Sequence, residues 1–178
     1  MTTKKITVTA MGIALFVVLS LCLQVPVFEN YYLCLGYVVL MVFCRYFGAF
    51  SSLAVGTLGV VLYCVLISGL RGMPGWAAGN VVIALALSLC WKITAGMKNP
   101  WLRRLIVAGV IVAATAAGIL GLKSFVEMVL YAQPFLIRVA KNTYAFVADV
   151  VVLALSIPIS EGLEEVVRKL FPKEIVDI

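Results

Sequence analysis

The sequence predicts an all-α integral membrane protein, a bundle of six helices with both termini in the cytoplasm. Its 178 residues are 64% hydrophobic and only 12% charged, whereas a soluble domain carries roughly a quarter charged residues. The apolar residues form continuous runs of about the twenty residues that a helix needs to cross a bilayer. These runs lack the alternating polarity of a membrane β-barrel, so we expect helices, whose backbone groups are paired internally.

The six predicted spans follow from the apolar runs and the residues that interrupt them. The first run begins after Lys4 and Lys5 and is stopped by Pro26, which cannot continue a helix. A short polar and aromatic loop precedes the second run, and a Gly- and Pro-rich turn follows the third. Gln133 and Pro134 separate the last two runs. The spans of this single transmembrane domain are predicted at residues 6–25, 32–47, 49–68, 76–95, 101–131 and 138–160.

The fifth predicted span is longer than a bilayer requires. A helix of roughly 30 residues reaches ~45 Å, whereas the hydrocarbon core is ~30 Å thick. We therefore expect the end of this helix to project from the membrane.

Lys and Arg residues are divided unequally between the two sides of the predicted bundle. Six spans place both termini on one side, and that side carries all but four of the 14 Lys and Arg residues. The basic side of a membrane protein faces the cytoplasm, so the loops at 26–32, 69–75 and 132–138 are predicted outside. The basic residues are scattered between spans, and nucleic acid is therefore not an expected partner. The four on the outer side are Arg71, Lys123, Arg138 and Lys141.

Polar and aromatic residues gather at the predicted outer end, where they could line a small-molecule pocket. Asn142 and Asp149 are seven apart and share a helix face, and Lys123 and Glu127 are four apart and can pair. Asp149 lies ~15 Å into its span, a depth at which an ionisable group suggests a function. The candidate substrate-binding residues are Glu29, Asn30, Tyr31, Arg71, Trp76, Asn80, Lys123, Glu127, Tyr131, Asn142 and Asp149.

Each of these residues also has a purely structural interpretation. The aromatic residues near span ends could be interface anchors, and Arg71 and Arg138 could meet lipid headgroups. Lys123 and Glu127 could be a structural pair, and Asp149 could bond Asn80 or Lys123 across the bundle.

The residue types disfavour an enzyme, a metal site or a bound cofactor. The chain has no His, which removes the usual base of a Ser or Cys nucleophile. Its five Cys form no CxxC pair and are better interpreted as small core residues. The segment 118–124 resembles a phosphate loop, but Leu122 stands where the Gly before Lys123 is required.

Ala10 and Ala14 lie four apart in the first span and share one helix face. Small residues let membrane helices approach closely. The pair could serve either internal packing or the docking of another protein.

The chain as a whole resembles the S component, the substrate-binding membrane subunit, of energy-coupling factor (ECF) vitamin transporters. The resemblance rests on the size, the six spans and the basic start Lys4-Lys5-Ile6. It also rests on the Ala-x-x-x-Ala segment at residues 10–14, on Gly79-Asn80, and on Asn142 with Asp149.

This resemblance implies capture of a vitamin outside the cell and delivery by toppling of the subunit in the membrane. Ala10 and Ala14 would dock on an ECF membrane coupling subunit, and two separate ATPase subunits would drive transport. The ligand is left open among cobalamin, pyridoxine, pantothenate and a pyrimidine precursor of thiamine.

Two other functions remain open from the residues alone. The chain could be a self-sufficient small secondary transporter that uses Asp149 as an intramembrane ionisable site. It could also be an assembly subunit of a membrane complex with no ligand of its own.

Overall fold

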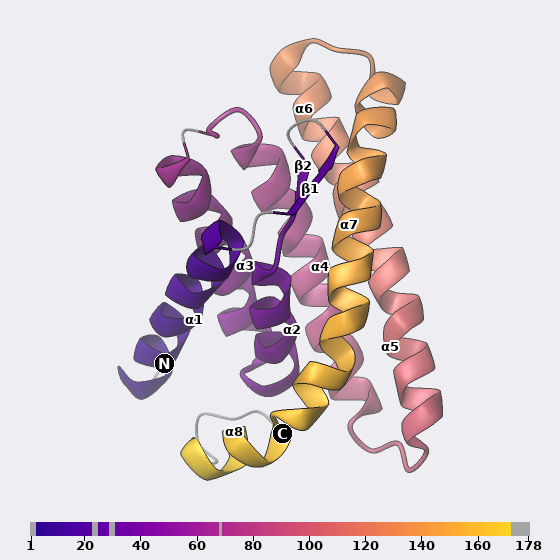
Figure 1. Cartoon of the computed structure of the whole chain (residues 1–178). Coiled ribbons are helices and arrows are strands. Elements are labelled where there is room, and N and C mark those ends of the chain that lie inside the picture. The colour runs from indigo at the N-terminus through magenta and orange to yellow at the C-terminus, as the bar shows by residue number, and fades with distance from the viewer. Residues whose placement is uncertain (1–2, 23–24, 29–30, 68, 172–178) are drawn as a thin grey trace.

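The computed structural model describes residues 3–22, 25–28, 31–67 and 69–171, and they form a helical bundle with one small hairpin (Figure 1). Five helical stretches are long and apolar enough to cross a membrane. The elements are α1 (Thr3–Cys22), β1 (Val25–Phe28), β2 (Tyr31–Leu33), α2 (Gly36–Tyr46), α3 (Gly48–Leu66), α4 (Met73–Thr94), α5 (Pro100–Thr115), η1 (Ala116–Lys123), α6 (Ser124–Tyr131), α7 (Phe135–Gly162) and α8 (Glu164–Leu170).

The chain runs up and down the bundle and leaves its connections at two ends (Figure 1). The hairpin, the α3–α4 connection and the α6–α7 turn lie at the upper end in this view. The start of α1, the α4–α5 connection and α8 lie at the lower end. The three connections predicted to share one side of the membrane therefore do share one end of the molecule.

The second predicted span, at residues 32–47, is too long, because the helix found there covers only Gly36–Tyr46. The bundle is helical as predicted, but it also contains a small hairpin that the sequence did not predict. Strands β1 and β2 pair antiparallel, with Val25 opposite Leu33 and a bulge between Pro26 and Phe28. Their β-branched and aromatic residues favour strands, and the hairpin gains support by packing against α7. The helix α2 that follows has only 11 residues, or ~16 Å, about half of the bilayer core.

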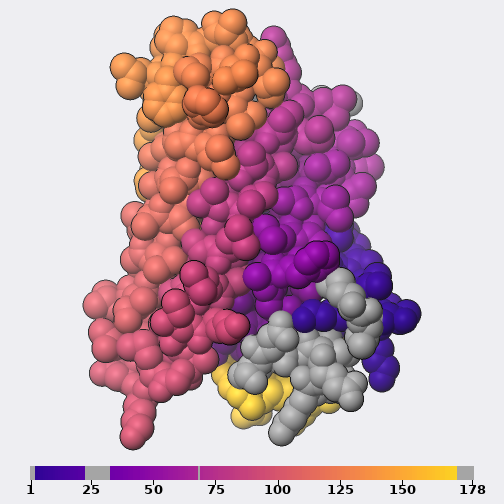
Figure 2. Space-filling model, turned by 180° about the vertical axis from the view of Figure 1, so that it is seen from behind, coloured from indigo at the N-terminus to yellow at the C-terminus, as the bar shows by residue number. Residues whose placement is uncertain are grey.

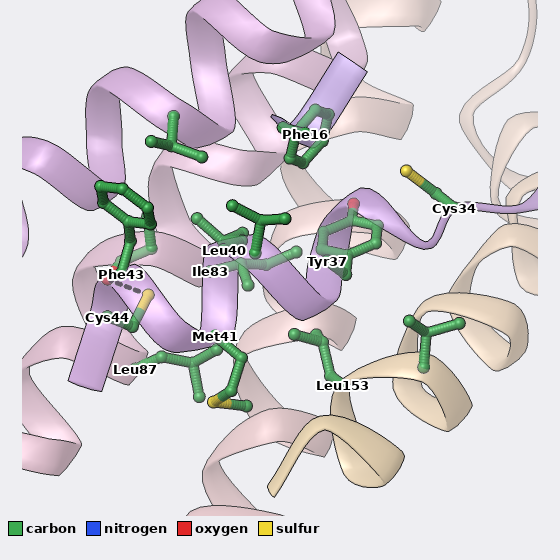
Figure 3. Packing of buried hydrophobic residues seen from close by; sticks show 14 of the residues in the cluster. Phe16, Cys34, Tyr37, Leu40, Met41, Phe43, Cys44, Ile83, Leu87 and Leu153 are labelled. Carbon is green, nitrogen blue, oxygen red and sulfur yellow. Dashed lines mark hydrogen bonds between the residues drawn. The ribbon is translucent and has the colours of Figure 1, made fainter. Parts of the chain in front are cut away.

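The helix α2 can be short because it is enclosed by other helices. It packs against α1, α3, α4 and α7. The side chains of Tyr37, Leu40 and Met41 are fully buried. Figure 3 shows these side chains among Phe16, Ile83, Leu87 and Leu153 from the surrounding helices. A helix that is apolar on all sides is typical of a buried position, and this one forms the centre of the core.

The predicted fifth span is one continuous helical stretch from Pro100 to Tyr131, but its middle is not an α-helix. Residues Ala116–Lys123 form a π-helix, η1. Helices of this kind are rare in proteins, and those that occur are often found at functional sites. Beyond η1, α6 and the start of α7 form the orange part of the upper end of the molecule in Figure 2. At 32 residues the helical stretch is longer than the ~20 that a bilayer needs, as the sequence predicted.

The π-helix lies unusually close to α4. A Cβ atom placed on Gly79 would be 2.8 Å from the Gly118 carbonyl oxygen, and one on Gly118 would be 2.6 Å from the Gly79 carbonyl oxygen. Only glycine at both positions permits this backbone contact. The contact sets the position of η1, and therefore of the Lys123 and Glu127 side chains that follow.

Candidate functional site

A cavity of about 840 Å³ opens at the upper end of the bundle. Its wall is built mainly from α3, α4, η1, α6, α7 and the α3–α4 connection, with single residues from α1, β2 and the segment that joins the hairpin to α2. Six residues predicted from the sequence line it, namely Arg71, Trp76, Lys123, Glu127, Tyr131 and Asp149.

The other predicted residues have different positions. Asn80 and Asn142 are 0% exposed and lie behind the wall, where they hold lining side chains in place. Glu29 and Asn30 lie outside the described residues. Tyr31 belongs to β2, and its side chain lies outside the described part.

Tyr37 joins three helices at the buried side of the cavity. Its hydroxyl group is within donating distance of Asn80 Oδ1, at 2.7 Å, and of Asp149 Oδ2, at 3.1 Å. The same oxygen accepts a hydrogen bond from Trp76 Nε1 at 2.9 Å. Asn80 in turn donates to the Gly56 carbonyl oxygen at 2.9 Å. The network fixes Trp76 and the Asp149 carboxyl group, both of which face the cavity.

The hydrogen-bond partner of Asp149 in this network is Tyr37, and not Asn80 as one structural interpretation of the sequence expected. The carboxyl group reaches Asn80 indirectly, through Tyr37, which sequence reasoning did not select. A tyrosine in an apolar run gives no signal of its role, because the partners of its hydroxyl group come from other helices.

Lys123 and Glu127 form a second polar cluster on the wall, together with Asn142. The Lys123 amine donates to Asn142 Oδ1 at 2.6 Å and lies 3.7 Å from Glu127 Oε1. The Asn142 amide donates to Ser124 Oγ at 3.0 Å and to Glu127 Oε2 at 3.1 Å. The pair expected from the four-residue spacing is present, and Asn142 ties it to α7. Buried charges that are paired and hydrogen-bonded in this way are tolerated in a low-dielectric surrounding.

Tyr131 organises the entrance of the cavity. Its ring contacts two guanidinium groups, with Arg71 Cζ 5.5 Å and Arg138 Cζ 4.9 Å from the ring centroid. Its hydroxyl group donates to the Arg71 carbonyl oxygen. Cation–π contacts of this kind favour arginine, and here they tie the α3–α4 connection to α6 and α7. Arg71 and Arg138 therefore belong to the entrance.

The cavity also contains residues that sequence reasoning did not single out as a site. Tyr63 packs edge-on against Trp76, with ring centroids 5.6 Å apart, and forms an aromatic wall. Arg138, Lys141 and Tyr144 did give a signal in the sequence, as basic or polar residues of the predicted outer side. The other lining residues include Ser20, Leu33, Cys34, Cys64 and Ile119, whose apolar surroundings in the sequence gave none.

The two faces of α1 differ in a way that bears on Ala10 and Ala14. Both alanines are exposed on the surface of the bundle. Gly12 is buried instead, and a Cβ atom there would come within 2.3 Å of the Phe43 ring. Internal packing of α1 therefore uses the Gly12 face, and the alanine face is open to lipid or to another protein.

The chain matches the model of a known family over most of its length. The model of the family described as "ECF-type riboflavin transporter, S component" matches residues 1–164. A comparison with curated proteins gave no significant match.

Proposed function

Because the chain belongs to the ECF-type riboflavin transporter S component family, we propose that its cavity is the site that captures the vitamin. S components are transporter subunits and not enzymes, and they work with an ECF membrane subunit and ATPase subunits. The chain is accordingly a multi-pass membrane protein. The observation that carries the proposal is a cavity of about 840 Å³ with two hydrogen-bonded polar clusters.

The first candidate ligand is a flavin, after the family's description. The cavity volume falls within the ~300–1,000 Å³ typical of sites for drug-sized ligands, and Tyr63 and Trp76 offer ring surfaces for a flat heterocycle. The Asp149 carboxyl group can accept hydrogen bonds from ligand N–H or O–H groups. The family description names riboflavin. It therefore does not favour cobalamin, and riboflavin replaces pyridoxine, pantothenate and the thiamine precursor as the first candidate.

The proposed orientation places the cavity outside a prokaryotic cell and both termini in the cytoplasm. It rests on the excess of Lys and Arg at the lower end of the bundle. Ala10 and Ala14, on the exposed face of α1, are the proposed docking pair for the membrane subunit. Two ATPase subunits then drive the toppling that delivers the vitamin.

Flavin binding to the purified chain tests the proposal. We expect riboflavin to quench tryptophan fluorescence, because Trp76 lines the cavity. Asp149→Asn should weaken binding by about tenfold, the worth of one hydrogen bond to a charged group. The matched control is Glu165→Gln in α8, whose side chain is 87% exposed at the opposite end, and it should bind as the wild type does. Equal affinity of all three chains would contradict the assignment of this cavity.

Reconstitution separates the proposed subunit from a self-sufficient transporter. In liposomes that contain only this chain, we expect no accumulation of flavin. Transport by the chain alone would favour the alternative in which Asp149 carries a coupling proton.

A further inference from the structure

The cavity has a surplus of positive charge. Lys123, Glu127 and Asp149 are 7%, 5% and 4% exposed and lie well inside. Lys123 pairs with Glu127, and Asp149 is hydrogen-bonded to the neutral Tyr37 hydroxyl group, so these three side chains supply no surplus of positive charge. Among the described lining residues the surplus therefore comes from three side chains nearer the surface, Arg71, Arg138 and Lys141.

Arg138 is the most buried of these three cations and has a donor without a partner among the described residues. Its side chain is only 17% exposed, and its Nη1 atom lies 3.6 Å from Glu127 Oε2, which is too long for a hydrogen bond. Its Nε atom is buried and has no hydrogen-bond partner among the described residues. Leaving a buried donor unpaired is unfavourable, especially on a charged group. The guanidinium group thus has donor capacity that the protein itself does not use.

Arg71 and Arg138 share a contact with the Tyr131 ring. Both guanidinium groups lie over its ring, and both line the cavity. Arg71 and Lys141 are exposed, so a ligand can reach them from the aqueous side. Guanidinium groups match the geometry of phosphate and carboxylate oxygens, with two parallel hydrogen bonds available from each.

We propose that Arg71, Arg138 and Lys141 form an anion-binding subsite at the cavity entrance, which receives a phosphate or carboxylate group of the transported molecule. The inference rests on the proposed function and adds to it a charge on the ligand. The aromatic and hydrogen-bonding groups deeper in the cavity receive the uncharged part of the molecule. Phospholipid headgroups carry the same phosphate chemistry, and the experiment must separate the two sources.

Riboflavin and riboflavin 5′-phosphate form a suitable pair of probes, because they differ only in the phosphate. The full chain is purified in uncharged detergent, and the dissociation constant of each flavin is measured by fluorescence quenching. We expect the phosphate ester to bind about tenfold more tightly than riboflavin, and this preference to shrink as salt is raised. Equal or weaker binding of the ester by the wild-type chain would overturn the proposal.

Charge variants locate the effect. In Arg138→Gln and in Arg71→Gln, the ratio of the dissociation constants of riboflavin and its phosphate ester should fall close to one. Arg138→Lys preserves the positive charge beside Glu127 and should retain part of the preference for the ester. Lys98→Gln removes an exposed positive charge at the opposite end of the bundle and should leave the preference unchanged. A preference that survives both arginine substitutions would refute the subsite.

Two further measurements distinguish failure of the subsite from failure of the flavin assignment. If neither flavin binds, the small molecule that copurifies with the chain is identified by mass spectrometry. An acidic molecule there supports the subsite and rejects flavin, whereas a neutral molecule, or none, rejects both. In a final arm, phosphatidylglycerol is added to the detergent; loss of the ester preference would assign the three cations to lipid headgroups and overturn the subsite.

Discussion

The contact between Gly79 and Gly118 allows a direct test of how α4 positions the cavity wall. In Gly118→Ala, the new Cβ atom would lie 2.6 Å from the Gly79 carbonyl oxygen and 3.2 Å from Ile83 Cγ1. The nearest atom belongs to a backbone, so a side-chain rotation cannot relieve the clash. Forcing an extra methyl group into a packed interior costs ~1–3 kcal/mol, and the higher helix propensity of alanine returns up to ~1 kcal/mol. We expect a net destabilisation of ~1–2 kcal/mol.

The matched control lies three residues further along the same π-helix. A Cβ atom on Gly121 would have its nearest neighbour, the Ala116 carbonyl oxygen, at 3.9 Å, which is an ordinary contact. Gly121→Ala should therefore be neutral or stabilising by up to ~1 kcal/mol.

The assay is unfolding of both variants and the wild type in mixed micelles of increasing dodecyl sulfate content, followed by circular dichroism. Flavin affinity is measured in parallel, because Gly118→Ala should also displace Lys123 and Glu127 and weaken binding. Equal stability of the two variants would refute the close approach of α4 and η1. A destabilised Gly118→Ala with unchanged affinity would refute its role in positioning the wall.

Three other substitutions test separate parts of the structure. Tyr37→Phe removes the hydroxyl group shared by Asn80, Asp149 and Trp76 and should cost ~1–3 kcal/mol in the same unfolding assay; an unchanged midpoint would contradict the network. Ala132→Gly should stabilise by ~0.5–1 kcal/mol, because Ala132 ends α6 with φ of 50°, a conformation that favours glycine; a loss of stability would contradict this geometry. Replacing both Ala10 and Ala14 by Trp should leave the unfolding midpoint and flavin affinity unchanged but abolish uptake in cells with the complete transporter. Misfolding of that variant would return the pair to an internal packing role.

The membrane character of the fold was predictable because it depends on local properties. Long apolar runs, and the residues that interrupt them, indicate where helices begin and end with no knowledge of neighbours. Residues 25–28 and 31–33 are the exception. The sequence predicted the end of a helix, a short loop and the start of the next helix there, whereas the residues form strands β1 and β2, which pack against α7.

The sequence was less informative about the site. It selected Asp149, Lys123 and Glu127 because charge within an apolar run is unfavourable unless it is paired. It gave no such signal for Tyr37, whose importance comes from three partners on other helices. For Arg138 it left a lipid contact open, since the fold alone places the guanidinium group over the Tyr131 ring.

The sequence by itself determined that this chain is a membrane bundle with a polar end, since hydropathy and charge are sums over local residues. Only the tertiary structure decided which polar groups meet. In the structure, α2 is enclosed by other helices and Gly118 lies against Gly79. Ala10 lies on the exposed face of α1, whereas Gly12 packs inside the bundle. These choices depend on close contacts between helices far apart in the chain, and local sequence patterns do not encode such contacts.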